Sequence, residues 1–322
     1  VGDNADEYSQ QFEKKWENIV RRAGHKLFGD LSLLTMTETK RLIREIKKFD
    51  PDLIHIHTIH HQCLNYSMLF QFLQEYNKPV IITMHDCWVF TGGCYHYSAQ
   101  KCDNFMRDCS GCPKVSGELD CHSTQTKYNL AKKNQFYQSM EKLYFTGVSK
   151  WICDEARKSI VKDKPIYTIR NGVDIDVFKD LRLQQTTKIM RQNLLNNKKY
   201  LVVGVASYWS ESKGMSDFLH LAERLDMADY QIVLVGDKKE FGSVPANVLL
   251  YGRTDNVNEL AHIYNAADVL VNMSIEESFG LVTAEAAACG TPTVAYASTA
   301  NIEIMKLVQN NLIEVGNFES LI

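Results

Sequence analysis

Two glutamates flank a turn of small residues in the last third of the chain. Glu277 belongs to a polar loop, and Glu285 falls in the first turns of a small-residue helix that opens near Leu281. Gly280 directly precedes that helix and follows an apolar segment that reads as a strand. A helix N-terminus beside a glycine exposes backbone N–H groups and the positive end of the helix dipole, so it can bind a phosphate. Carboxylates at its sides can accept hydrogen bonds from sugar hydroxyls, as acidic residues do in dinucleotide folds.

The same pattern has a purely structural interpretation. Alanine-rich helices between strands are common in α/β proteins, and most exposed glutamates only solvate a surface. Here the two glutamates, the glycine at the turn and the Gly-Thr-Pro exit at 290–292 occur together. That combination favours a binding site over two unrelated surface carboxylates.

Apolar runs alternate with helical patterns along both halves of the chain, which is typical of parallel sheets covered by helices. In the first half we expect strands at 53–56, 80–83, 144–148 and 166–169, and helices at 37–48, 63–76, 126–143 and 150–160. In the second half we expect strands at 200–206, 230–236, 248–252, 269–272 and 293–296, and helices at 213–225, at 258–267 and from 281. The polar stretch 174–199 separates the halves. The prediction is therefore an α/β protein with two Rossmann-like domains, 1–173 and 174–322, whose parallel sheets face across a cleft.

The composition excludes several functional classes. The 322 residues carry a net charge of −3 with a pI near 6.4, which argues against nucleic acid as the main partner. No apolar run reaches the roughly 18 residues of a bilayer span, and the charged segment 1–22 is unlike a signal peptide. Nine cysteines in a large α/β chain indicate a reducing compartment, so we expect a cytoplasmic protein.

The segment EESFGLVTAEAAACGTPTVA, with its Glu277-x7-Glu285 spacing, resembles the donor-site motif of retaining glycosyltransferases of family GT4, which have the GT-B fold. The resemblance covers most of the chain. It implies transfer of a sugar from a UDP- or GDP-linked donor to a hydroxyl of a glycan or lipid-linked acceptor, with retention of configuration. The family pattern begins with a Gly-rich loop and ends with a longer terminal helix, so we expect both ends of this chain to be truncated.

The resemblance implies a role for each residue of the turn. Glu277 would hold hydroxyls of the donor sugar, Glu285 would hold the ribose, and the backbone of Phe279, Gly280 and Leu281 would hold the diphosphate.

Lys213-Gly214 matches the Lys-Gly pattern of the same family, after the strand 200–206. An ammonium at this place can neutralise a leaving diphosphate as the glycosidic bond breaks. The alternative is a surface lysine that only covers apolar neighbours. Ser207 and Ser212 stand where the family usually has basic residues, so we expect Ser207 to bind the donor through its hydroxyl. Neither Asp50/Asp52 nor Asp174/Asp176 is placed to hold a metal at the diphosphate, and the scheme requires no cofactor for catalysis.

His85 follows the strand 80–83 in a Thr-Met-His-Asp run. In GT4 enzymes a histidine at this location touches the donor sugar, so the resemblance implies that role for His85. A denser histidine group precedes it, and a metal site there is the alternative to hydrogen-bonded histidines. Its members are His55, His57, His60 and His61. Alternation predicts that the first two share one face of a buried strand.

Four cysteines occupy the long loop that follows His85. Cys94, Cys102, Cys109 and Cys112 end in a C-x2-C pair, and four thiolates in such spacing suit a structural Zn²⁺. A long loop without secondary structure also needs some such staple. Free buried cysteines, or disulfides in an oxidising compartment, are the alternatives. The segment HDCWVFTGGCYHY with these cysteines also resembles GT4 enzymes that build polysaccharides of the colanic-acid kind.

Two weaker features concern recognition. Arg253 and Asn256 follow a strand end and could line a base pocket. The basic helix at 37–48 could approach anionic lipid as a peripheral membrane contact at the inner face, although a solvated helix face is the simpler interpretation.

Two other functions share the same residues. A GT-B epimerase or phosphorylase would use the same cleft, but it should show a further catalytic carboxylate or a cofactor lysine. A catalytically weak or inactive module that only binds a nucleotide sugar is the non-enzyme alternative, and the serines at 207 and 212 favour it.

Overall fold

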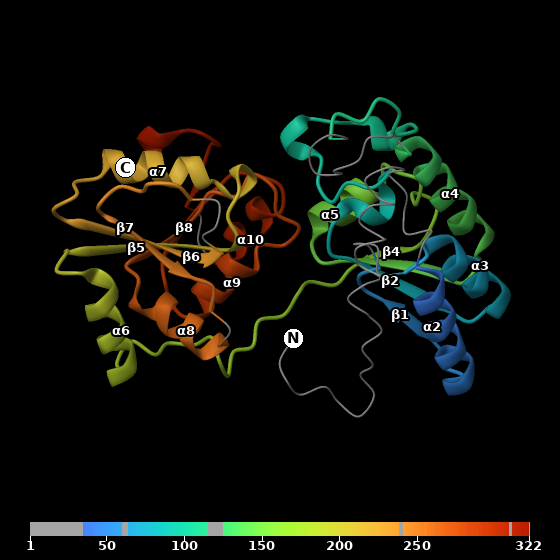
Figure 1. Ribbon diagram of the computed structural model, residues 1–322, viewed down its shortest axis with the longest axis horizontal. Helices are drawn as coiled ribbons and strands as arrows, with labels where there is room; N and C mark the ends of the chain where they lie inside the picture. The colour runs from blue at the N-terminus through green and yellow to red at the C-terminus, as the bar shows by residue number, and fades with distance from the viewer. Residues whose placement is uncertain are drawn as a thin grey trace. The chain divides into compact units, whose positions relative to one another are not determined.

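The computed structural model describes residues 35–59, 64–114, 125–237, 241–254, 256–308 and 311–321. They form two compact α/β units, each built on its own parallel sheet (Figure 1). The first unit runs to Val148 and includes Ile152–Thr168, and the second contains Ser149–Trp151 and the chain from Ile169. The domain limits 1–173 and 174–322 stay a prediction. His60, His61 and Cys63, the expected start of a helix, lie outside the described residues.

The first unit contains a four-stranded sheet in the order β1-β2-β3-β4, with all neighbours parallel. Its strands are β1 (Ile54–Ile56), β2 (Val80–Met84), β3 (Leu143–Gly147) and β4 (Ile166–Thr168). Its helices are α2 (Met36–Phe49), α3 (Tyr66–Tyr76), α4 (Thr126–Ser139) and α5 (Lys150–Ala156). The two central strands are the buried ones, as expected when helices cover a parallel sheet. The first strand, by contrast, is the edge of the described sheet.

The second unit contains a six-stranded parallel sheet in the order β10-β9-β8-β5-β6-β7. Its strands are β5 (Tyr200–Tyr208), β6 (Tyr230–Asp237), β7 (Val248–Gly252), β8 (Val269–Asn272), β9 (Thr293–Tyr296) and β10 (Leu312–Ile313). Its helices are α6 (Gln185–Leu195), α7 (Met215–Arg224), α8 (Val257–Ala266), α9 (Leu281–Ala288) and α10 (Asn301–Val308). Leu201 and Val203 belong to one buried cluster and Val202 to another, because successive strand residues point to opposite faces. Both faces of this sheet are therefore core.

The predicted fold class is confirmed, since both halves are parallel α/β sheets with their helices. One helix of the second unit was not predicted, however. The polar stretch 174–199 contains α6, whose Thr187 and Leu194 are buried. The Thr187 hydroxyl also hydrogen bonds to His262 Nδ1 of α8 at 2.8 Å. A few buried positions at helical spacing suffice to fold a polar segment onto a core.

Other differences concern short elements. The loop after β2 contains three 3₁₀ turns, η1 (Cys87–Phe90), η2 (Ser98–Gln100) and η3 (Asn104–Met106), where no secondary structure was expected. The helix expected at 126–143 ends at Ser139, because β3 begins at Leu143. α10 and β10 were not predicted at all. Within the described part of the chain, no helix combines the length and apolar character that crossing a bilayer demands.

Candidate active site

Gly280 forms the turn between the β8 loop and α9. Its φ of 92° and ψ of 52° lie in the left-handed region, which L side chains rarely adopt. A Cβ built there would also approach Asn301 Oδ1 to 3.1 Å. The glycine lets the chain enter α9 without a side-chain cap. The first N–H groups of α9 have no acceptor within the helix, so they can serve an anionic ligand.

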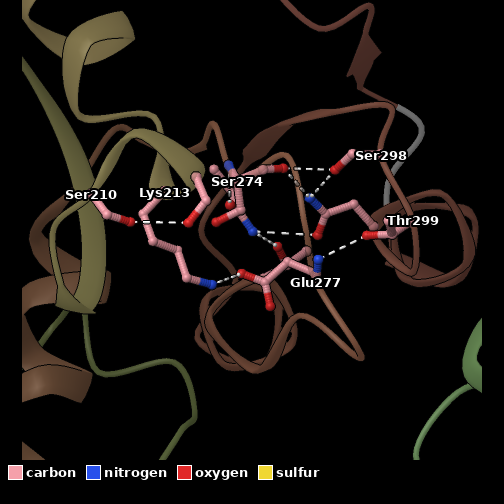
Figure 2. A network of polar contacts seen from close by, with 10 residues as sticks. Ser210, Lys213, Ser274, Glu277, Ser298 and Thr299 are labelled. Atoms are coloured by element: carbon pink, nitrogen blue, oxygen red, sulfur yellow. Dashed lines mark hydrogen bonds and ion pairs between the residues drawn. The ribbon is translucent and has the colours of Figure 1, made fainter. Parts of the chain in front are cut away.

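A buried polar network fixes the loop that leads to this turn (Figure 2). The Asn272 side chain donates to Thr283 Oγ1 at 3.1 Å and accepts from the Ser274 N–H, also at 3.1 Å. The Ser298 hydroxyl donates to the Ser274 carbonyl at 2.6 Å. Since these groups are buried and paired with each other, the loop between β8 and α9 has a defined shape.

Lys213 and Glu277 form an ion pair at the centre of this arrangement (Figure 2). Lys213 Nζ lies 2.6 Å from Glu277 Oε1, and the two side chains are 24% and 19% exposed. The pairing joins two segments far apart in the sequence. A half-buried pair with this geometry is screened less by water than a surface pair.

The backbone holds Lys213 against the β8 loop. Lys213 ends the short turn η4 (Glu211–Lys213) before α7, whereas we expected it to begin the helix. The Ile275 N–H donates to the Ser212 carbonyl at 3.0 Å. Gly214 then packs so closely that a Cβ there would lie 2.4 Å from the Met273 Cβ. The position of the ammonium is therefore set by main-chain contacts as well as by its own charge.

Glu277 is held from the other side by residues that the sequence did not indicate. Its N–H donates to Thr299 Oγ1 at 2.8 Å, and its carbonyl accepts from the Ala300 N–H at 3.2 Å (Figure 2). Both residues precede α10, an element that the analysis of the sequence missed.

The arrangement can exchange partners with a ligand. The ammonium of Lys213 has three donors and the carboxylate of Glu277 has several acceptor sites, so neither is exhausted by one contact. A ligand with phosphate and hydroxyl groups would give each of them a second partner. The Ser210 and Ser212 hydroxyls, 3.0 Å apart, lie just before Lys213 in the chain and add neutral donors.

Glu285 is held by a tyrosine. Tyr264 of α8 donates its hydroxyl hydrogen to Glu285 Oε2 at 2.9 Å. Burial raises the pKa of the Glu285 carboxyl, and the Tyr264 hydrogen bond acts in the opposite direction. Cys289, the residue after α9, lies near this carboxyl, and burial raises the pKa of its thiol to about 12. Tyr264 has no sequence signal of its own, because a tyrosine in an apolar helix looks like core.

We expect Tyr264→Phe to weaken nucleotide binding by about 2- to 10-fold near neutral pH, because one hydrogen bond to the carboxylate is lost. The hydrogen bond favours the charged carboxylate, so its loss raises the pKa of Glu285 further. Affinity should then fall at a higher pH in the variant than in the wild type as the solution is acidified. Calorimetric titration with UDP and with GDP from pH 5 to 8 measures this.

Tyr296→Phe is the matched control, since its buried hydroxyl donates to another carboxylate, Asp217, at 2.8 Å. Equal pH profiles for Tyr264→Phe and this control would contradict the role of Tyr264.

The remaining predicted donor-site residues are dispersed around the second unit. Phe279 is buried, so only its backbone can meet a ligand, whereas Leu281 is exposed at the first position of α9. Ser207 is exposed near the carboxyl end of β5, and Arg253 is exposed after β7. Asn256 instead has a local structural contact. Its side chain caps α8 by accepting from the Asn258 N–H at 2.9 Å.

His85 lies in the first unit, directly after β2, and pairs with a second histidine. Its Nε2 is 2.9 Å from His57 Nδ1, so the two rings share one hydrogen and at least one of them accepts. His55 Nε2 contacts Thr83 Oγ1 at 2.7 Å. The prediction that His55 and His57 share a face is supported by ring centroids 4.3 Å apart. The prediction of a buried strand is wrong, because β1 lies at an edge of the described sheet. The His55 ring is exposed on that strand, and the His57 ring is exposed just after it.

The described residues contain no group of three or more His, Cys, Asp or Glu side chains arranged to hold a metal ion. None of Cys94, Cys102, Cys109 and Cys112 forms a disulfide in the described part of the chain. Cys109 accepts from the Gly92 N–H at 3.3 Å, and burial raises the pKa of its thiol to about 11. The four cysteines are thus not gathered into a ligand set among the described residues, and the zinc stays a prediction.

Metal analysis checks that prediction. If the four cysteines bind Zn²⁺, protein purified without chelator should contain about one zinc per chain, since four thiolates complete a structural site. The quadruple variant with serine at 94, 102, 109 and 112 should contain none. Zinc-free wild-type protein would remove the hypothesis.

Two parallel α/β units of this kind define the GT-B class of glycosyltransferases. Residues 3–177 match the model of Glycosyltransferase Family 4, and residues 185–322 match that of Glycosyl transferases group 1. The first match alone covers more than half of the 322 residues. The chain therefore belongs to the GT4 family of glycosyltransferases, as its motifs indicated.

Named relatives share sequence at a modest level. The putative colanic acid biosynthesis glycosyl transferase WcaC of Escherichia coli (strain K12) is 24% identical in an alignment of 305 positions that covers 89% of this chain and 68% of WcaC. N-acetyl-alpha-D-glucosaminyl L-malate synthase of Bacillus anthracis is 26% identical in an alignment of 158 positions that covers 46% of this chain and 40% of that protein. The similarity to the second protein thus covers less than half of either chain.

Solved structures confirm the fold. Sucrose-phosphate synthase from Thermosynechococcus elongatus superimposes with a TM-score of 0.62 at 18% identity, covering 88% of this chain and 67% of that one. Anabaena HepE in complex with UDP gives a TM-score of 0.60 at 19% identity, covering 88% of this chain and 70% of that one. At these identities the likeness concerns the fold alone.

Proposed function

We propose that this protein transfers a sugar from a UDP- or GDP-linked donor to a hydroxyl of a glycan or lipid-linked acceptor, with retention of configuration. The observation that carries the proposal is the Lys213–Glu277 ion pair, 2.6 Å long, in a loop that leads into the α9 N-terminus. The similarity to WcaC, which is named for colanic acid biosynthesis, supports a role in building a surface polysaccharide, and the UDP bound to HepE supports a nucleotide-linked donor.

Each residue has a task in this proposal. The α9 N-terminus at Gly280 and the ammonium of Lys213 bind the diphosphate, and Lys213 stabilises the charge that develops on it. Glu277 then holds hydroxyls of the donor sugar, and Glu285 holds the ribose. His85 is the histidine that contacts the transferring sugar. Ser207 and Arg253 complete the donor site, the first through its hydroxyl and the second at the base.

The acceptor hydroxyl attacks the anomeric carbon on the face from which the diphosphate leaves. The C–O bond to the diphosphate breaks, the new glycosidic bond forms, and the proton of the hydroxyl passes to the departing phosphate. The scheme requires no divalent cation. We place the reaction in the cytoplasm, at the inner face of the membrane when the acceptor is a lipid.

A donor screen tests the proposal. UDP- and GDP-linked hexoses are titrated by calorimetry, and transfer and hydrolysis are followed for each one that binds. One donor should bind and turn over when a lipid-linked glycan is added as acceptor. Binding without turnover would favour an inactive nucleotide-sugar-binding module, which the serines at 207 and 212 make the second candidate. No binding at all would overturn both.

A further inference from the structure

One face of α4 carries four buried side-chain donors that all point at the loop after β2. They stand at Thr126, Asn129, Lys133 and Tyr137, a spacing that places them in one row along the helix. Their residues are between 0% and 4% exposed. We call this set the α4 donor row.

Every member of the α4 donor row binds a backbone carbonyl of that loop. Tyr137 donates to the Val89 carbonyl at 3.1 Å, and Asn129 donates to the Gly92 carbonyl at 3.3 Å. Thr126 donates to the carbonyl of Cys109 at 2.7 Å. Buried carbonyls need partners, and here one helix supplies them to a segment that has no sheet neighbour of its own.

Lys133 is the centre of the row. Its ammonium donates to the carbonyls of Trp88 and Thr91, the latter at 2.9 Å, and lies 3.5 Å from the centroid of the Trp88 ring. Its side chain is fully buried. Burying a cation without a carboxylate partner is unfavourable, and the two carbonyls and the aromatic face offset that cost only in part.

The electrostatic surroundings agree with that description. Burial lowers the pKa of the Lys133 ammonium to about 7, while the nearby Cys94, Cys109 and Asp86 act to raise it. A methionine would fill the same space without this cost, but it would remove one hydrogen bond from each of two carbonyls in buried residues. A buried lysine at position 133 is therefore explained by its hydrogen bonds to the carbonyls of the loop.

The loop approaches α4 as closely as a backbone can. A Cβ on Gly92 would lie 2.5 Å from the Thr126 carbonyl oxygen and 2.9 Å from the Cys109 Cβ. Only glycine fits between them, so the row and the loop form one interlocked layer.

This layer begins two residues after β2. His85 and Asp86 are the only residues between Met84, which ends β2, and Cys87, which begins η1. Asp86 caps η1 by accepting from the Trp88 N–H at 2.8 Å. The backbone of His85 is thus fixed by the sheet on one side and by η1 on the other, and η1 is held by the α4 donor row.

We propose that the α4 donor row positions His85, with Lys133 as the main positioning residue. This inference rests on the proposed function, in which His85 contacts the transferring sugar. It also gives the long loop a staple made of hydrogen bonds from a helix, whether or not the four cysteines bind a metal.

Lys133→Met tests the proposal in the full chain. We expect kcat for the donor that the screen selects to fall about 10- to 100-fold, as misplacement of a contact residue does. The Kd for UDP or GDP, whichever that donor carries, should change less than about 2-fold, a factor worth a small fraction of binding free energy. The imidazole NMR signal of His85, identified by its loss in His85→Gln, should shift.

Lys132→Met is the matched control, because it removes the neighbouring lysine of the same helix, whose Nζ lies over the Phe136 ring at 5.4 Å. It should change neither kcat nor the His85 signal. Lys133→Met behaving like Lys132→Met in both measurements would overturn the proposal.

Tyr137→Phe covers the case in which Lys133→Met fails to fold, since it deletes a single hydroxyl. It should shift the His85 signal and lower kcat by a smaller factor, and no change in either would count against the row. Wild-type protein that transfers no sugar would refute the proposed function only. The His85 signal would still decide whether the α4 donor row positions that residue.

Discussion

Replacing Lys213 by methionine is expected to lower kcat by about 100- to 1000-fold, the usual cost of removing a charge-stabilising donor from a transition state. Lys213 is the cation that the structure pairs with Glu277, and the serines at 207 and 212 leave it with more of the diphosphate charge to stabilise. Steady-state kinetics with the donor found by the screen measure the effect.

Lys198→Met is the control for this prediction, because that lysine lies in the same unit and its Nζ donates to the Met227 carbonyl at 2.6 Å, away from Glu277. It should retain wild-type kcat. A Lys213→Met enzyme with more than about a third of the wild-type kcat, a difference below 1 kcal/mol in the barrier, would rule out the catalytic role.

The ion pair also has a structural part, which a double variant separates. Lys213→Met alone leaves the Glu277 carboxylate, 19% exposed, without its cation, so thermal stability should fall. Adding Glu277→Gln removes the uncompensated charge and should restore part of the Tm. It should not restore kcat, since the double variant has neither the ammonium nor the carboxylate with which the proposed site binds the nucleotide sugar. Recovery of both together would mean that Lys213 serves the fold alone.

Glu285→Ala is expected to weaken binding of the donor nucleotide by about 10- to 100-fold, the range for losing hydrogen bonds to a charged acceptor. The carboxylate is half-buried and already aligned by Tyr264, so it can accept ribose hydroxyls with little reorganisation. Calorimetry with UDP and GDP at pH 7.5 measures the affinity.

The control is Glu319→Ala, which removes an exposed glutamate of the same unit that pairs with Arg224 at 2.6 Å. It should bind nucleotide as the wild type does. Unchanged affinity in Glu285→Ala would overturn the ribose role and, with it, the interpretation of Tyr264.

The glutamate turn could be predicted from sequence because its geometry is local. A strand, a glycine and a helix in succession place Gly280 at a helix N-terminus whatever the rest of the chain does. The same holds for the alternating elements of both sheets. The expected parallel α/β class follows from that alternation and is observed.

The ion pair of Lys213 with Glu277 needed the tertiary structure. β5 and β8 are direct neighbours in the sheet, with Val202 opposite Val269, so their carboxyl ends lie side by side. Lys213 follows one strand and Glu277 the other. Strand order is set by how the whole sheet packs, and no local pattern reports it.

The analysis of the sequence missed two functional candidates for the same reason. Tyr264 and Lys133 sit on helices whose sequences suggest packing and solvation, yet one hydroxyl holds Glu285 and one ammonium holds the turn after His85. The role of a buried polar side chain depends on the group to which it hydrogen bonds, and here that group lies in a distant segment of the chain.

The sequence by itself determined the family, the parallel α/β class and the strand-to-helix turn between Glu277 and Glu285, because each depends on residues close together in the chain. Only the tertiary structure decided that Lys213 meets Glu277, that Tyr264 holds Glu285 and that α4 holds the loop after β2. Each of these contacts joins segments that are distant in the sequence and come together only in the folded protein, so no local pattern predicts them.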